Sequence, residues 1–194
     1  MREKYHNIYR IPSARAVWHK YDDGIYFITI CTSGRYHYLG EITNKPREIQ
    51  LTQIGKYSTE IFTNITSYYS YAKISSFVIM PNHIHAIITI DLSCRRNTIH
   101  HDSFTNRNSV KSHGNPMLSV CLGTVVRGIK ARITHYAHVN KFIFGWQSRF
   151  HDHIIRDQKE FNDITLYIEN NVVNWEIDCF NEINKKSSLN NIRK

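Results

Sequence analysis

The stretch Phe77–Ile90, FVIMPNHIHAIITI, decides the fold of this sequence. Residues 73–80 and 83–91 are rich in apolar and β-branched side chains, a composition that predicts two strands. Pro81 and Asn82 interrupt the run between them, because proline cannot donate to a strand ladder. We therefore expect two neighbouring strands that pair antiparallel.

The second of these strands presents two histidines on one face. Side chains alternate along a strand, so one face carries Ile84, Ala86, Ile88 and Ile90 and the other carries His83, His85, Ile87 and Thr89. Two imidazoles on one face could bind one divalent metal, and a phosphate substrate would favour Mg²⁺ or Mn²⁺ at the open positions. This spacing of two histidines is by itself weak evidence for a metal site. The chain has 12 histidines, and His151 and His153 have the same spacing.

Further strands and helices are expected on both sides of this pair. Residues 25–32, IYFITICT, predict another buried strand, and residues 142–155 contain more aromatic and β-branched runs. Apolar residues at helical spacing predict helices over 52–66 and 117–138, although two glycines weaken the second. A last helix is expected from residue 157 to about 174. Strands and helices alternate irregularly, which favours an α+β fold.

The composition is that of a basic protein with enough apolar residues for one core. Its 194 residues include 25 Lys and Arg against 16 Asp and Glu, a net charge of +9. Such an excess suggests a polyanionic partner or serves only solubility. No apolar run is long enough to span a bilayer, and the polar first residues do not resemble a signal peptide. Scattered cysteines without a CxxC pair fit a reducing cytoplasm.

The last predicted helix carries a tyrosine of interest. Asp157 and Glu160 resemble a capping box at its start. Tyr167 falls roughly 100° from the centre of the apolar stripe, which consists of Phe161, Ile164, Ile168 and Val172. Asn171 stands one turn further along the same face. A tyrosine in this position is usually a packing residue with a solvated hydroxyl, so its helix position alone does not make it a nucleophile.

Five basic residues are candidates for DNA contact: Arg127, Lys130, Arg132, Arg149 and Arg156. The first two share a face of the 117–138 helix away from its apolar stripe. Charges on a helix surface are usually only solvated. Phosphate contact gains weight only beside a nucleic-acid active site.

Taken together, four ordered blocks resemble the repeat-associated tyrosine transposases, members of the HUH-type single-tyrosine transposases of small bacterial insertion sequences. The blocks are YDDGIYFITICT with LGEI and LTQIGK, FVIMPNHIHAIITI, LGTVVRGIKARIT, and WQSRFHDHIIRDQKEFNDITLYIENNVVNW. The resemblance extends over about residues 20–178, which we expect to form the nuclease domain with a mobile loop at about 92–116. Residues 1–19 would be a basic extension and residues 179–194 a polar tail.

The resemblance implies an RRM-like, or ferredoxin-like, antiparallel sheet with helices packed mainly on one face. It implies that His83 and His85 are metal ligands on a central strand and that Tyr167 is the nucleophile on a C-terminal helix. Asn171 takes the position of a third ligand through its amide oxygen. The sequence departs from the family's pattern where Val172 replaces a proline and where Phe150-His151 replaces a frequent pair of tyrosines.

The implied activity is that of a bacterial, nucleoid-associated nuclease and strand transferase acting on single-stranded or hairpin DNA as a monomer or homodimer. With Mg²⁺ or Mn²⁺ polarising the scissile phosphate, Tyr167 would attack and leave a 5′-phosphotyrosine and a 3′-hydroxyl. Two alternatives stay open. One is a nucleic-acid-binding module of the same fold without cleavage, and the other is a metal-dependent phosphoesterase acting on small molecules.

Overall fold

Four antiparallel strands organise the chain: β1 (Gly24–Cys31), β4 (Ala72–Ile79), β5 (His83–Ile90) and β6 (His151–Ile155). Their order across the sheet is β4-β5-β1-β6, so β5 and β1 are central and β6 is an edge strand. The elements follow as βαββαβ along the chain, which with this order is the ferredoxin-like, or RRM-like, topology. The predicted α+β class and the antiparallel pairing of β4 with β5 are confirmed.

The computed structural model describes residues 21–44, 47–93, 120–175 and 181. The expected N-terminal extension, nearly all of the expected loop and nearly all of the expected tail lie outside the described residues.

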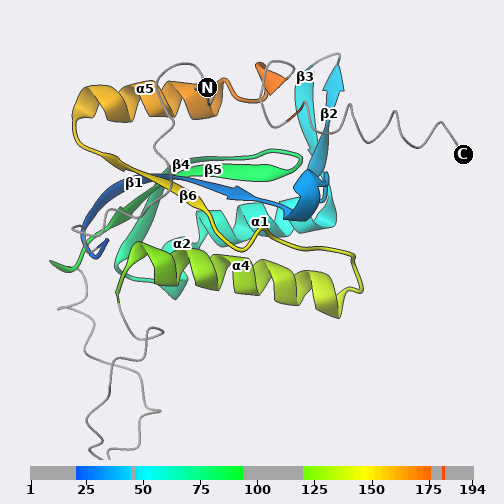
Figure 1. Cartoon of the computed structure of the whole chain (residues 1–194), viewed down its shortest axis with the longest axis horizontal. Helices are drawn as coiled ribbons and strands as arrows, with labels where there is room; N and C mark the ends of the chain where they lie inside the picture. The colour runs from blue at the N-terminus through cyan, green and yellow to red at the C-terminus, as the bar shows by residue number, and fades with distance from the viewer. Residues whose placement is uncertain (1–20, 45–46, 94–119, 176–180, 182–194) are drawn as a thin grey trace, which may run out of the picture.

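The helices cover the two faces of the sheet unequally, as Figure 1 shows. Helices α1 (Gln53–Thr63), α2 (Ile65–Tyr68) and α4 (Leu122–Val139) lie on one face, and α5 (Gln158–Glu169) lies alone on the other. The expectation of helices mainly on one face is met. A hairpin of β2 (Gly40–Asn44) and β3 (Arg47–Leu51) and a short 3-10 helix, η2 (Ser33–Arg35), connect β1 to α1.

The sheet separates two hydrophobic cores. The larger lies against α1 and α4 and includes the even-numbered residues of the central strands, Tyr26, Ile28, Ile30, Ile84, Ala86, Ile88 and Ile90. The smaller lies under α5 and contains Ile87, Ile155, Ile164 and Ile168. Because adjacent side chains of a strand point to opposite faces, the odd-numbered residues of β5 face α5.

Two predicted helices end earlier than their apolar spacing suggests. The helix expected over 52–66 breaks at Asn64, whose carboxamide donates to the Glu60 carbonyl at 3.0 Å. The helix expected to reach residue 174 ends at Glu169, where the Asn170 carboxamide donates to the Leu166 carbonyl at 2.8 Å. In both places the same carbonyl also accepts from the backbone amide of that asparagine, at 3.0 Å, so the asparagine side chain adds a second hydrogen bond at the end of the helix.

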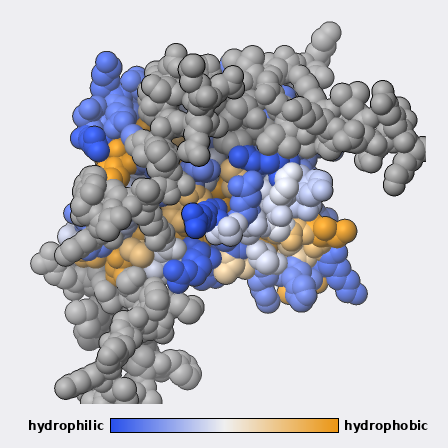
Figure 2. Space-filling model, in the orientation of Figure 1, coloured by the Kyte–Doolittle hydropathy of each residue, from blue (hydrophilic) through white to orange (hydrophobic). Residues whose placement is uncertain are grey.

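The surface mixes hydrophilic and apolar regions. Figure 2 shows a hydrophobic patch where α4 ends, and Val139, Phe142 and Ile143 are exposed there. Within the described part of the chain, none of the helices is both long and apolar enough to cross a membrane.

Candidate active site

Two histidines lie side by side on the face of β5 that α5 covers. His83 and His85 are 0% and 2% exposed, and their ring centroids are 4.5 Å apart. Ile84 between them belongs to the larger core on the opposite face. The structure therefore places both imidazoles on one face, as the alternation along the strand predicted.

Each imidazole is oriented by a polar side chain at its Nδ1 atom. Thr29 lies directly opposite His85 on β1, and its Oγ1 is 2.8 Å from His85 Nδ1. Asn82 comes immediately before β5, and its Oδ1 is 2.8 Å from His83 Nδ1. These contacts occupy the Nδ1 side of each ring, so the Nε2 atoms are the ones available for chemistry.

Burial keeps both imidazoles neutral. Desolvation lowers the pKa of His85 to about 3, although a hydrogen bond with the Ile28 backbone opposes this change. Desolvation also lowers the pKa of His83 well below its ordinary value, and His85 and the Arg35 guanidinium add to the effect. A neutral imidazole has a lone pair on one ring nitrogen, which is the form that binds metals.

Tyr167 reaches this pair from α5. Its hydroxyl is 3.3 Å from His85 Nε2, and its ring stands edge-on to the His85 ring at 5.3 Å between centroids. Phe27 on β1 contacts both rings. The tyrosine is half-buried beside the smaller core, so one end of the ring is packed while its hydroxyl points at an imidazole.

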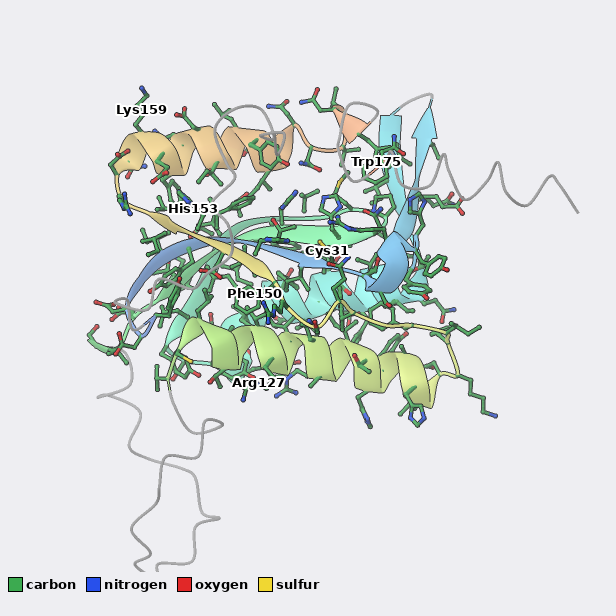
Figure 3. All side chains as sticks on the ribbon, in the orientation of Figure 1. Cys31, Arg127, Phe150, His153, Lys159 and Trp175 are labelled. Atoms are coloured by element: carbon green, nitrogen blue, oxygen red, sulfur yellow. The ribbon has the colours of Figure 1, made fainter. Side chains whose placement is uncertain are left out.

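The start of α5 is tied to the edge strand. Asp157 is the N-cap and accepts from the Glu160 amide at 2.8 Å, as the predicted capping box requires. Glu160 accepts from His153 Nε2 at 2.6 Å and from the Arg156 amide at 2.9 Å. His153 lies on β6 beneath α5 in Figure 3. The glutamate therefore links β6 to the helix that carries the tyrosine.

Asn171 follows α5 and is 3% exposed. Its amide oxygen is buried and has no hydrogen-bond partner among the residues that the structure describes. In the chain it stands between Tyr167, which contacts His85, and Trp175, whose ring stacks on His83 at 6.0 Å between centroids. Figure 3 shows Trp175 on the same side of the sheet as α5.

The donor set contains nitrogen and oxygen without sulfur, which suits a borderline or hard divalent cation rather than a soft one. Two neutral imidazoles and a buried amide oxygen without a partner would offer nitrogen and oxygen ligands. Among the described residues, no group of three or more His, Cys, Asp or Glu side chains is placed to hold a metal. Within the described residues, a third protein ligand for the two histidines would come from outside these four residue types, and the buried Asn171 amide oxygen is a candidate.

Three of the five basic candidates surround one cavity, on the side of the sheet opposite Tyr167. Arg127 and Lys130 on α4 and Arg149 before β6 line a space of about 570 Å³, with Phe150 and Asp152 also on its wall. Figure 3 shows Arg127 and Phe150 on the α4 side. The cavity is therefore separated from the histidines by the sheet.

Some basic side chains already have structural contacts. Lys130 donates to the Gln147 carbonyl, and burial lowers the pKa of this lysine. The guanidinium of Arg132 lies 3.9 Å from the centre of the Tyr68 ring. Arg156 is exposed at the junction of β6 and α5. The five candidates thus form one cluster of three and two separate positions.

Sequence reasoning missed the residues that orient the histidines. The sequence analysis did not select four of them: Thr29, Asn82, Phe27 and Trp175. The sequence contained a clue to the first two. Thr29 lies in a predicted strand, and Asn82 stands beside the first histidine. Recognising the role of Thr29 required the register of β1 against β5, which the sequence alone does not provide.

Comparison with known proteins finds a sequence relative that matches most of the chain, and the matching structures include two of low sequence identity. No protein-family model matches the chain. A REP-associated tyrosine transposase bound to a REP hairpin is 19% identical with a TM-score of 0.47, covering 78% of this chain and 68% of that one. A crystal structure described as a transposase candidate from Deinococcus radiodurans R1 is 13% identical with a TM-score of 0.36, covering 88% and 97%.

The sequence relative is much closer. An uncharacterized protein of Haemophilus influenzae (strain ATCC 51907 / DSM 11121 / KW20 / Rd) is 35% identical over 181 residues, which are 92% of this chain and 97% of that protein. The match therefore extends over the whole of the candidate site. This chain belongs to the same protein family as the Haemophilus influenzae protein.

Proposed function

We propose that the chain is an HUH-type single-tyrosine transposase, a nuclease and strand transferase that cuts single-stranded DNA through a 5′-phosphotyrosine. The observation that carries the proposal is the 3.3 Å contact between the Tyr167 hydroxyl and His85 Nε2, across 82 positions of sequence. The family resemblance assigns one residue as the nucleophile and the other as a metal ligand. Their meeting is what that chemistry requires.

The covalent step joins the tyrosine oxygen to the scissile phosphate. A bond forms between Tyr167 Oη and phosphorus while the bond from phosphorus to the 3′-oxygen breaks. The phenol loses its proton, and the departing oxygen gains one and becomes a 3′-hydroxyl. The 5′ end stays on the tyrosine as a phosphodiester, so attack by the 3′-hydroxyl of another strand end restores DNA without an external energy source.

Mg²⁺ or Mn²⁺ fits the residues present, with His83, His85 and Asn171 as its protein ligands. Both imidazoles are neutral, and the asparagine has a buried oxygen with no partner in the described part of the chain. A bound ion would polarise the scissile phosphate and stabilise its developing charge. Because the histidines are buried beneath α5 and Trp175, the phosphate would approach from the exposed side of the half-buried Tyr167.

The substrate class is single-stranded or hairpin DNA. A net charge of +9 favours a polyanion, and Arg127 and Arg149 present two exposed guanidinium groups around the cavity by α4. The contact between Tyr167 and His85 within one chain favours a monomer for the covalent step, and a homodimer is the alternative. An enzyme with this substrate would work in the bacterial cytoplasm, at the nucleoid.

The decisive experiment is covalent trapping on labelled hairpin DNA with Mn²⁺. The wild-type protein should form an adduct that survives denaturation and maps to Tyr167 by mass spectrometry. Tyr167→Phe should form none while binding the same DNA, because only the attacking oxygen is removed. The matched control is Tyr68→Phe, an exposed tyrosine on the other face of the sheet, which should leave the adduct unchanged.

The rival functions predict other results. Tight DNA binding without an adduct would support a non-catalytic binding module of the same fold. Hydrolysis of small phosphodiesters without DNA binding would support a phosphoesterase. An adduct on another residue, or normal adduct formation by Tyr167→Phe, would refute the assignment of the nucleophile.

A further inference from the structure

The turn that precedes the first histidine is fixed by hydrogen bonds from three directions. Met80 donates to the His83 carbonyl at 2.9 Å and closes the tight turn between β4 and β5. The Asn82 carbonyl accepts from the backbone and the hydroxyl of Thr32 at 2.9 and 3.0 Å. Leu39 donates to the Pro81 carbonyl at 3.0 Å. The Asn82 carbonyl and the backbone on both sides of Asn82 are therefore held by hydrogen bonds.

The orientation of the Asn82 carboxamide follows from its surroundings. Its Nδ2 donates to the Arg35 carbonyl at 3.2 Å. A carboxamide turned the other way would place Oδ1 against that carbonyl oxygen, where neither group can donate. Oδ1 is therefore the atom that faces His83 Nδ1, at 2.8 Å. Because Oδ1 can only accept, the hydrogen in this contact belongs to the histidine.

We propose that Asn82 is a positioning residue that holds His83 in the tautomer with hydrogen on Nδ1 and the lone pair on Nε2, ready to bind a divalent cation. The inference rests on the proposed function, because the tautomer of His83 matters only if this histidine binds the metal. In metal sites, a ligating histidine generally donates its other ring nitrogen to such a partner, which sets the tautomer and the ring direction.

The alternative is a purely structural role through Nδ2, which ties the turn to η2 at Arg35. Two substitutions separate the roles. Asn82→Ala removes both the acceptor and the donor. Asn82→Asp keeps an oxygen that accepts from His83 Nδ1 but loses the donor to the Arg35 carbonyl. A matched control is Asn64→Ala, an exposed asparagine whose carboxamide also donates to a backbone carbonyl, on the opposite side of the sheet.

The first measurement is the tautomer of His83 by ¹⁵N NMR of the metal-free full-length protein. We expect hydrogen on Nδ1 in the wild type, Asn82→Asp and Asn64→Ala, and a mixture of tautomers in Asn82→Ala. Hydrogen on Nε2 in the wild type would overturn the proposal without any variant, so the test does not depend on the variants folding. An unchanged tautomer in folded Asn82→Ala would also overturn it.

The second measurement is Mn²⁺ affinity by calorimetry, with circular dichroism as the folding control. Asn82→Ala should bind Mn²⁺ about 10–100-fold more weakly, whereas Asn82→Asp should stay near the wild type. Equal losses in both variants would assign the residue to the structural role and overturn the proposal. A wild type with the expected tautomer that binds no Mn²⁺ would instead refute the metal part of the proposed function, and with it the purpose given to Asn82.

Discussion

Lowering the pH from 7 to 5 should destabilise the metal-free protein through its buried histidines. His85 has a pKa of about 3 in the folded chain against 6.5 for an ordinary histidine. Between these values the unfolded chain binds a proton that the folded chain excludes, so stability is present above pH 6.5 and falls as the pH drops toward 3. From the two pKa values, His85 alone costs about 2 kcal/mol between pH 7 and pH 5. His83 acts in the same direction.

The assay is urea unfolding at pH 7 and pH 5 in EDTA, followed by circular dichroism. Wild type is compared with His85→Gln, which cannot titrate. Carboxylates titrate equally in both proteins, so the loss of stability between the two pH values should be about 2 kcal/mol smaller in the variant. His135→Gln, at an exposed position on α4, should behave as wild type. Equal losses in wild type and His85→Gln would show that this imidazole is not held neutral, and the site geometry would be wrong.

Four further predictions concern the proposed third metal ligand, the basic cavity and the start of α5. Asn171→Ala should raise the Mn²⁺ concentration needed for cleavage about tenfold, and an unchanged requirement would remove it from the metal site. Arg127→Ala should flatten the slope of log binding constant against log salt by about 0.7 in anisotropy titrations, whereas an unchanged slope would leave it a solvated charge. Lys130→Ala should lower Tm, because the half-buried ammonium of Lys130 donates to the Gln147 carbonyl. Glu160→Gln and His153→Gln should each cost about 1 kcal/mol, with a double-mutant cycle showing coupling; additive losses would mean that the hydrogen bond between them does not anchor α5.

The parts of the fold that follow a local period were predictable. The alternation in 83–91 assigned each side chain of β5 to its face, because a strand repeats every two residues wherever it lies. The approach of Tyr167 to His85 was different. The helical period of the last helix placed Tyr167 beside the apolar stripe. Only the family resemblance indicated which strand this helix would cover.

The parts that depend on tertiary contact were not predictable. Gly128 weakened the predicted helix, yet the structure uses the absence of a side chain there. A Cβ at this position would stand 1.6 Å from the Tyr69 hydroxyl, so a larger residue would have to displace the Tyr69 side chain, which follows α2. The β2–β3 hairpin escaped prediction because its strands are short and mix charged with apolar residues. Thr29 needed the register between two strands, which no pattern within one of them contains.

The separation of the two cores by the sheet has a consequence for how a gene of this kind decays. The side chains that stabilise the sheet against α1 and α4 are different from those that stabilise α5. On the proposed function, a frameshift or stop codon after Ile155 would remove the proposed nucleophile and the third candidate ligand together, while the residues of the larger core and of the cavity lined by Arg127 would all be retained. Truncation would then be a direct route from the proposed transposase to a DNA-binding protein without cleavage. In genomes that carry such copies, shortened reading frames ending near this point should outnumber those ending inside the sheet.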